Sequence, residues 1–488
     1  MSSKRFTNKL KDVSIAMTFN DVILLPGWTR IEPDEADLTT FIGKTIKLNL
    51  PFISSPMDTV TESEMAISLA REGGIGIIHR NCPIEYQLKL VKKVKRAESF
   101  IITDVKTISK DKKVKEALEI MHTFGINGLP VITEERKLIG IVTGRDVRFA
   151  DPEVKVEDVM TTDVIFADEK ITEDDAKKIL HKNKIEKLPV VNKDMKLIGL
   201  ITYKDLMLKG KFPNSSRDMD GKLLCGAAIS PTDFKRAKML DKEVDLLVTD
   251  VSHFHNENLF DATKKLLKEI STPLMVGSIG TYEAAIDCLT KLEPIVGLRC
   301  GIGSGSICST AVVTRAGSPT LYATAAAADA VREVGADVAV VADGGVKNPG
   351  DIALALAVGA SAVMMGNIFA GTKESPGRLI SIQGRYYKTY WGMGSEAARQ
   401  KRYSLDRYSK PSKSIPEGVE GYVPFKGTVN DIVNELIGGL KASMGYVGAA
   451  NIKEMWEKAK LAGVTMVGSK EIMPHDIFLP GGTEQKFE

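Results

Sequence analysis

Short apolar runs, each followed by a polar or glycine-rich turn and then a helical stretch, recur along most of this chain. Eight of them occur, at residues 51–54, 74–78, 223–228, 244–249, 273–276, 295–298, 338–341 and 362–365. A buried strand, a turn and a helix form the unit of a parallel α/β fold. Eight such units predict a (β/α)8 (TIM) barrel. A doubly wound sheet is the alternative, but no Gly-x-Gly-x-x-Gly follows the first run.

The series of strands is interrupted once, by a segment that repeats itself. Three motifs recur 59 residues further on: Leu-Pro-Val at 129 and 188, a strand-to-turn motif at 140–143 and 199–202, and an aspartate at 146 and 205. A constant offset across separate motifs indicates a duplication. We therefore expect a closed pair of copies at 98–156 and 157–211, each with the order extended segment, helix, strand, turn, strand, helix. The barrel then comprises residues 1–97 and 212–488.

Length, charge and cysteine content narrow the class of protein. A chain of 488 residues exceeds an ordinary single domain, and a net charge of +3 argues against nucleic acid as the main partner. There is no apolar run of about 18 residues and no apolar stretch of a secretory signal, so neither a membrane span nor secretion is expected. The five cysteines form no Cys-x-x-Cys pair, which indicates free thiols in a reducing, cytoplasmic compartment.

The strongest chemical signal is the glycine-rich segment 301–310, which ends in Cys308, Ser309 and Thr310. Glycines let the backbone adopt positive φ and approach a ligand closely. Successive N–H groups of such a loop can bind an anion, and its carbonyl groups can bind a cation. A thiol at the end of the loop is placed to attack the bound ligand. The alternative is a tight turn followed by a small buried cysteine, because free cysteine commonly lies in the core.

Glycines also follow the last two predicted strands, in Asp343-Gly344-Gly345 and Gly366-Asn367. In (β/α)8 barrels these two loops commonly bind phosphate through backbone N–H groups and helix N-termini. We therefore expect the cysteine to face a phosphorylated ligand. Asp343 could hold a ribose diol, although an aspartate at this position could instead cap the next helix.

The two copies of the insert resemble cystathionine-β-synthase (CBS) domains, which pair into a Bateman module. The resemblance rests on Gly140, Thr143 and Asp146 in the first copy and on Gly199, Thr202 and Asp205 in the second. In each copy the threonine lies three residues after the glycine, which departs slightly from the CBS signature. The resemblance implies that the hydroxyl and carboxylate contact adenine or guanine nucleotides. An insert that only aids folding or assembly is the alternative.

As a whole the chain resembles the inosine-5′-monophosphate (IMP) dehydrogenase / GMP reductase family. The segments that carry the resemblance are 301–310, 342–345, 370–377, 390–395 and 416–418, in that order. The resemblance implies NAD-dependent oxidation of IMP to XMP in guanine nucleotide biosynthesis, with K+ and a homotetramer or octamer. NADPH-dependent GMP reduction and a nucleotide-sensing regulator without turnover are the alternatives. An Arg-Tyr pair before Pro416 favours the dehydrogenase, because a reductase does not need to activate water.

The resemblance also implies roles for single residues. Cys308 would add to C2 of the base and carry the covalent thioimidate, and Thr310 would lie beside the reacting carbon. Arg407 and Tyr408 would activate water from a mobile flap near 396–424, with Arg402-Tyr403 as an alternative pair. The implied IMP contacts are Ser55, Met57, Ser306, Asp343, Gly345, Gly366, Asn367, Tyr390, Gly392, Met393, Gly394 and Glu417.

The implied cofactor and metal contacts overlap on the cysteine loop. NAD would contact Asp250, Ser252, Arg299, Gly301 and Gly303. K+ would bind carbonyl groups of Gly301, Gly303 and Cys308, with Glu471, Ile472 and Met473 supplied by a neighbouring subunit. Five positions depart from the family pattern and bear on how the cofactor is held: Phe254, Ser278, Ala311, Asn367 and Trp391, the last standing where the family has an arginine.

Overall fold

The structure, a computed structural model, describes residues 10–11, 13–97, 101–103, 105–401, 403, 406 and 416–473, with backbone alone at 205, 208 and 209. The chain divides into two compact units. The first comprises Met1–Val94, Asn214–Asp218 and Leu224–Glu488, and the second comprises Lys95–Pro213 and Met219–Leu223. None of the helices in the described ranges is long and apolar enough to cross a membrane.

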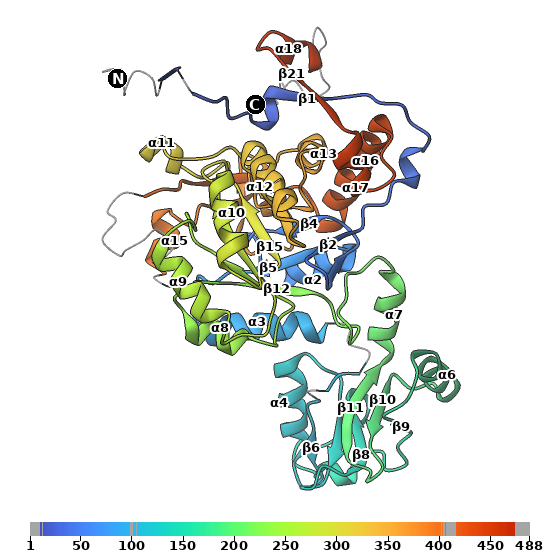
Figure 1. The fold of residues 1–488 in the computed structure, drawn as a ribbon. Coiled ribbons are helices and arrows are strands. Elements are labelled where there is room, and N and C mark those ends of the chain that lie inside the picture. The colour runs from blue at the N-terminus through green and yellow to red at the C-terminus, as the bar shows by residue number, and fades with distance from the viewer. Residues whose placement is uncertain are drawn as a thin grey trace. The chain divides into compact units, whose positions relative to one another are not determined.

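The first unit is built on a closed barrel of eight parallel strands (Figure 1). In chain order they are β4 (Phe52–Ser54), β5 (Ile75–Ile78), β12 (Cys225–Ile229), β13 (Leu246–Thr249), β14 (Leu274–Ile279), β15 (Gly297–Cys300), β16 (Ala339–Asp343) and β17 (Ala362–Met365). Strand β5 pairs with β12 across the interruption, and β17 pairs with β4 to close the ring. The predicted (β/α)8 barrel is therefore confirmed.

Helices surround this barrel, and each strand is buried on both faces. The helices are α2 (Ser63–Glu72), α3 (Ile84–Arg96), α8 (Phe234–Leu240), α9 (Glu257–Leu266), α10 (Tyr282–Lys291), α12 (Thr320–Val334), α13 (Pro349–Ala357), α16 (Val429–Val447) and α17 (Ile452–Lys458). Ile53, Ile77 and Met364 belong to an inner cluster that fills the barrel. Burial on both faces explains why the strands read as continuous apolar runs instead of alternating patterns.

Short elements extend the barrel at the strand ends and at the termini. After α14 (Asn367–Ala370), a sheet forms from β18 (Leu379–Ile382), β19 (Arg385–Trp391) and β20 (Glu420–Pro424), with α15 (Glu396–Gln400) between the last two strands. The hairpin β2 (Thr40–Ile42) and β3 (Ile46–Leu48) adds Ile42, Ile46 and Leu48 to the inner cluster. Near the termini β1 (Val22–Leu25) pairs with β21 (Lys460–Gly463), which precedes α18 (Gly468–Ile472).

The second unit contains two copies of one motif. The first copy is β6 (Ile108–Ser109), α4 (Val114–Phe124), β7 (Gly128–Ile132), β8 (Leu138–Thr143) and α5 (Gly144–Val147). The second is β9 (Ala167–Asp168), α6 (Glu173–Asn183), β10 (Lys187–Val191), β11 (Leu197–Thr202) and α7 (Tyr203–Lys211). Both copies form a three-stranded sheet, and both have an irregularity at the equivalent step, between Val131 and Ile132 and between Val190 and Val191. Two sheets with the same number of strands and a register shift at the equivalent position support the inferred duplication.

The two copies exchange their flanking segments, which the proposed boundary at 156 did not anticipate. Thr161, assigned to the second copy, bridges to Ile141 in β8 of the first. Ile102, assigned to the first copy, bridges to Leu200 in β11 of the second, and Ile101 packs against the second copy's core. One edge strand of each sheet, β8 and β11, thereby gains a backbone partner that the three-stranded sheet alone would not supply.

Candidate functional site

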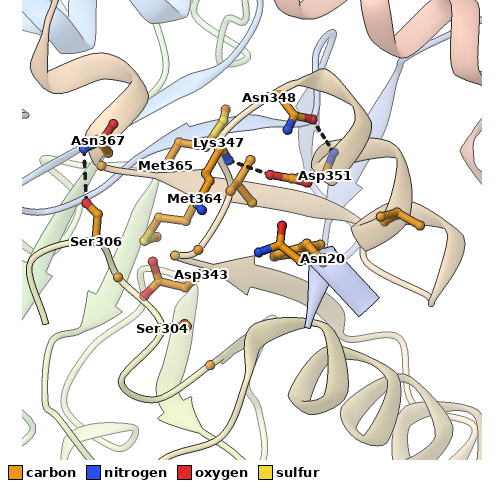
Figure 2. Close-up of a pocket in the computed structure, with 18 of the residues that line it drawn as sticks. Asn20, Ser304, Ser306, Asp343, Lys347, Asn348, Asp351, Met364, Met365 and Asn367 are labelled. Carbon is orange, nitrogen blue, oxygen red and sulfur yellow. Dashed lines mark hydrogen bonds between the residues drawn. The ribbon is translucent and has the colours of Figure 1, made fainter. Parts of the chain in front are cut away.

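A cavity of about 1470 Å³ lies against the loops that follow the barrel strands. Every predicted IMP contact except Gly394 lines it, as do Cys308, Thr310, Ser252, Arg299, Gly301 and Gly303. Figure 2 shows Ser306 from the loop after β15, Asp343 at the end of β16 and Asn367 at the start of α14 lying around one space. The structure thus brings together residues that are up to 362 positions apart in the sequence, from Ser55 to Glu417.

The cysteine loop turns its thiol toward this cavity. Cys308 is partly exposed, whereas the other four cysteines are buried. Gly301 has φ of +123°, and a Cβ there would lie 2.6 Å from the carbonyl oxygen of Asp343, so no other residue fits without a shift. The backbone N–H of Cys308 donates to the carbonyl of Gly305 at 2.9 Å, which closes the turn. Cys308 is therefore not the core cysteine of the alternative interpretation.

A chain of hydrogen bonds links the thiol to a buried carboxylate. The Sγ of Cys308 donates to Oγ1 of Thr310 at 3.3 Å, and this hydroxyl donates to Oε2 of Glu417 at 2.9 Å. The backbone N–H of Ser309 also donates to the carbonyl of Glu417 at 3.3 Å. Glu417 was predicted as an IMP contact, and its bond to Thr310 was not predicted. Such a chain can carry a proton between the cavity and the carboxylate.

Two arginines and two aspartates form a buried network beside the cavity. Nη1 of Arg299 donates to Oδ2 of Asp343 at 2.6 Å, and Nη2 donates to the carbonyl of Thr249 at 3.1 Å. Asp250 is fully buried, with its carboxylate 3.7 Å from Nε of Arg80 and 3.9 Å from Nη2 of Arg299. Asp250 thus lies behind the cavity wall. Sequence reasoning gave Arg80 no role, although its place directly after β5 was an available signal.

The expected phosphate site is made of small groups at the ends of β15 and β17. Nδ2 of Asn367 donates to Oγ of Ser306 at 3.1 Å (Figure 2). A Cβ at Gly366 would lie 2.9 Å from the hydroxyl of Tyr390, so glycine keeps this wall open. Burial raises the pKa of Tyr390 above its usual range, opposed by a hydrogen bond with Ser306. Tyr390 therefore stays protonated at neutral pH and can donate a hydrogen bond.

The base-binding turn 392–394 lies against the cysteine loop. A Cβ at Gly392 would lie 2.9 Å from the carbonyl of Ile307, the residue before Cys308. The backbone N–H of Glu417 donates to the carbonyl of Gly394 at 3.2 Å. Gly394 thus contacts the site through Glu417 although it does not line the cavity.

The predicted K+ carbonyl groups lie on one loop. The carbonyl of Gly301 accepts a hydrogen bond from Oγ of Ser278 at 2.8 Å, so one of its two lone pairs is used. Ile472 and Met473 line the cavity within this same chain, whereas Glu471 is not among the residues that line it. Among the described residues no cluster of three His, Cys, Asp or Glu side chains could hold a metal ion.

Part of the prediction concerns residues that the structure does not describe. Arg407 and Tyr408 lie outside the described residues, as does Arg402 of the alternative pair. Of the predicted flap, the structure describes residues 396–401, 403, 406 and 416–424. The side chain of Asp205 in the second CBS-like copy is likewise outside the description. In the first copy, Thr143 and Asp146 bond to each other: Oγ1 of Thr143 donates to Oδ2 of Asp146 at 2.7 Å.

A (β/α)8 barrel whose cavity is lined by a cysteine loop and by glycines at the ends of β16 and β17 is typical of an enzyme that acts on a phosphorylated ligand. Residues 16–475 match the model of the IMP dehydrogenase / GMP reductase domain. The chain belongs to the IMP dehydrogenase / GMP reductase family, which confirms the resemblance inferred from the motifs.

Proteins that match this chain over nearly their whole length include both IMP dehydrogenases and a GMP reductase. Inosine-5′-monophosphate dehydrogenase of Korarchaeum cryptofilum is 56% identical, covering 95% of this chain and 97% of the relative. The same-named protein of Methanocaldococcus jannaschii is 46% identical, covering 97% and 98%. A solved GMP reductase from Trypanosoma brucei, a cysteine-to-alanine variant in complex with guanosine 5′-monophosphate, is 35% identical with a TM-score of 0.89, covering 96% and 100%. Identity is therefore higher to the dehydrogenases.

Proposed function

We propose that this chain is an IMP dehydrogenase that oxidises IMP to XMP with NAD+ as the hydride acceptor. The observation that carries the proposal is the match, at up to 56% identity over 95% of the chain, to proteins named IMP dehydrogenase. The geometry supports it, because a partly exposed thiol lies at the end of a glycine loop and bonds to Thr310. GMP reductase remains the second candidate, favoured by the structural match to a GMP complex.

The chemistry we propose begins at the Cys308 sulfur. Its thiolate would form a bond to C2 of the purine, and NAD+, when bound, would supply the acceptor for the hydride that C2 releases. The resulting thioimidate on Cys308 is cleaved by water, which adds to C2 and releases the thiolate and XMP. The thiol proton has a route through Thr310 to Glu417, because those groups are hydrogen-bonded in sequence. Arg407 and Tyr408 are our candidates for activating the water.

The substrate is held, in this proposal, by groups that line the cavity. The phosphate binds Ser306, Tyr390, Asn367 and the backbone of Gly345 and Gly366, whose positions at strand ends suit an anion. The ribose diol binds Asp343, whose carboxylate is oriented by the buried guanidinium of Arg299. The purine ring lies against Ser55, Met57, Gly392 and Met393, and its polar edge meets Glu417 and Gly394.

The proposed cofactor contacts are Ser252, Arg299, Gly301 and Gly303 in the lining, together with Asp250. Because Asp250 lies between two arginines, a ribose could reach its carboxylate only if Arg80 or Arg299 moved. K+ fits the chemistry of the loop, since the carbonyl groups of Gly301, Gly303 and Cys308 are the hard oxygen ligands it prefers. Glu471, Ile472 and Met473 of a neighbouring subunit would complete that site in a homotetramer or octamer.

The repeat unit supports a regulatory proposal. We propose that it binds adenine or guanine nucleotides at the CBS-like motifs, and that the protein acts in the cytoplasm. Support for the compartment comes from five free cysteines, which persist as thiols under reducing conditions.

One assay tests the catalytic proposal. The protein is incubated with IMP, NAD+ and K+, and NADH is followed by absorbance, with Cys308→Ala in parallel. We expect NADH formation in the unchanged protein and none in the variant. NADPH consumption with GMP and no NADH formation with IMP would assign the reductase instead. Nucleotide binding without turnover in either assay would favour a regulator.

A further inference from the structure

A buried carboxylate next to the predicted site, Asp58, is held by donors from three separate segments. The side chain of Asp58 has no exposed surface. Its Oδ1 accepts a hydrogen bond from the indole Nε1 of Trp391 at 2.9 Å. Its Oδ2 accepts from Nδ2 of Asn81 at 3.0 Å and from Nζ of Lys401 at 2.7 Å. Asp58, Asn81 and Lys401 have no role in the site described above, and Trp391 entered only as a departure from the family pattern.

Two of the three donors, Trp391 and Lys401, come from segments that bound the turn 392–394, and the third, Asn81, comes from the loop after β5. Trp391 ends β19 and directly precedes the turn 392–394. Lys401 is the C-cap of α15, the helix that follows this turn. Asn81 also donates to the carbonyl of Ala398 inside α15 at 3.0 Å. The carboxylate of Asp58 is therefore hydrogen-bonded to the chain both before and after the turn 392–394, which we expect to contact the purine.

The turn 392–394 is hydrogen-bonded to the segment 417–419, which includes Glu417. The backbone N–H of Gly392 donates to the carbonyl of Val419 at 3.1 Å, and the N–H of Glu417 donates to the carbonyl of Gly394 at 3.2 Å. A shift of Trp391 would therefore move Glu417 and the bond that Glu417 accepts from Thr310. This gives a continuous path of contacts from Asp58 to the residue beside Cys308.

Of the three side chains that donate hydrogen bonds to Asp58, Lys401 is the one that carries a positive charge. A buried carboxylate is costly unless a cation or several donors compensate it. The indole and the amide are neutral donors, and within the described residues the cation in ion-pair distance of Asp58 is Lys401. Burial lowers the pKa of His79, but hydrogen bonds with Cys82 and Glu62 and the nearby charges of Cys82 and Asp58 raise it to about 9, so His79 is a second, more distant positive charge. Nζ of Lys401 also lies 5.9 Å from the centroid of the Trp391 ring, within reach of a cation–π contact. An arginine at 391 would supply donor and charge from one side chain.

We propose that Asp58 is a positioning residue for the base-binding turn, and that Lys401 supplies the positive charge that Trp391 does not. The IMP affinity of this chain then depends on a lysine outside the cavity lining. The inference rests on the proposed function, since it takes the turn 392–394 to hold a purine nucleotide.

The test uses the full chain with Lys401→Met, Trp391→Arg and the double variant. We expect Lys401→Met to weaken IMP binding about tenfold, the effect of losing one charge-assisted hydrogen bond, with a smaller change in kcat. Trp391→Arg should make the lysine dispensable, so that the double variant binds IMP as Trp391→Arg does. Lys238→Met is the control, because Lys238 pairs with Glu269 at 2.6 Å on an exposed surface.

The outcomes separate this inference from the proposed function. Unchanged IMP affinity in Lys401→Met, or a double variant no better than Lys401→Met alone, overturns the inference. If Trp391→Arg does not fold, Asp58→Asn replaces it: with the charge gone, adding Lys401→Met should change IMP affinity little. IMP affinity is measured by calorimetry without NAD+. A protein that binds IMP but forms no NADH would overturn the proposed function, and the IMP affinities of the variants would still test the inference about Asp58 and Lys401.

Discussion

A threonine and an acidic residue are hydrogen-bonded in both units of the molecule, but they are brought together differently. In the repeat unit, Thr143 and Asp146 are three residues apart and form a capping box at the start of α5. In the barrel unit, Thr310 and Glu417 are 107 residues apart and meet beside the cavity. The first pair caps its own helix and forms between near neighbours in the sequence. The second exists only because the fold assembles it, which is typical of a functional site.

The largest effect is expected where the assembled pair is broken. Thr310→Val removes the hydroxyl between Cys308 and Glu417, so kcat should fall by about 10²- to 10³-fold, as for loss of a positioned proton carrier. Steady-state NADH formation measures this. Thr314→Val, on the same short helix, removes a hydroxyl bonded only to nearby backbone groups and should change kcat little. An unaltered kcat in Thr310→Val would show that the pair is structural, like that of the repeat unit.

A smaller effect is expected at the carboxylate that Arg299 orients. Asp343→Asn keeps the shape but weakens the charge-assisted bond to Arg299 and the proposed bonds to ribose. We expect KM for IMP to rise about 10- to 150-fold, because hydrogen bonds to charged groups are worth about 1.5–3 kcal/mol. Asp337→Asn is the control, since Asp337 pairs with Lys44 at 3.7 Å on the surface. Equal KM values in both variants would remove Asp343 from the site.

In the repeat unit the local pair should affect stability and not turnover. Asp146→Ala removes the capping box of α5 and should destabilise the second unit by about 1 kcal/mol, as helix caps do. Urea unfolding followed by hydrogen exchange in residues 138–147 measures this, with NADH formation unchanged. Loss of nucleotide binding without loss of stability would instead show that Asp146 serves a ligand, and the contrast between the two pairs would fail.

The smallest effect is a pH dependence of a cap in the barrel unit. Thr428 and Asp431 form the same capping box at α16, and hydrogen bonds from the backbone and side chain of Thr428 lower the pKa of Asp431 below 3.8. A lowered pKa in the folded state contributes stability above the unfolded value, and this is lost as the pH falls through the folded value. Asp431→Asn should therefore be less stable than the unchanged protein at pH 6, and the difference should shrink below pH 3.8. A difference that stays constant with pH would contradict this.

Much of the fold was predictable, because its signals are local. The eight apolar runs match the eight barrel strands, and the constant offset of the repeats matches two sheets with the same irregularity. Gly301 and Gly345 were predicted to permit close approach, and both have positive φ. The exchange of flanking segments across the predicted boundary at 156 was not predicted, because it depends on which edge strand needs a partner.

The site was predicted less completely than the fold. The residues around the cavity were named from the family resemblance, but the partners of their charges were not. Asp250 was expected to face the cofactor, yet its carboxylate is buried between Arg80 and Arg299. Asp58 and Lys401 carried no motif at all. Charged pairs leave no periodic signal in a sequence, so their members cannot be matched by spacing.

The sequence by itself determined the strand order, the repeat and the positions of the glycines. These follow from periodicity and backbone preference, which act between near neighbours. Only the tertiary structure decided that Asp58 would meet Lys401, 343 residues away, and that Thr310 would meet Glu417. A buried charge must find a partner wherever folding places one, and that position is set by the packing of the whole barrel.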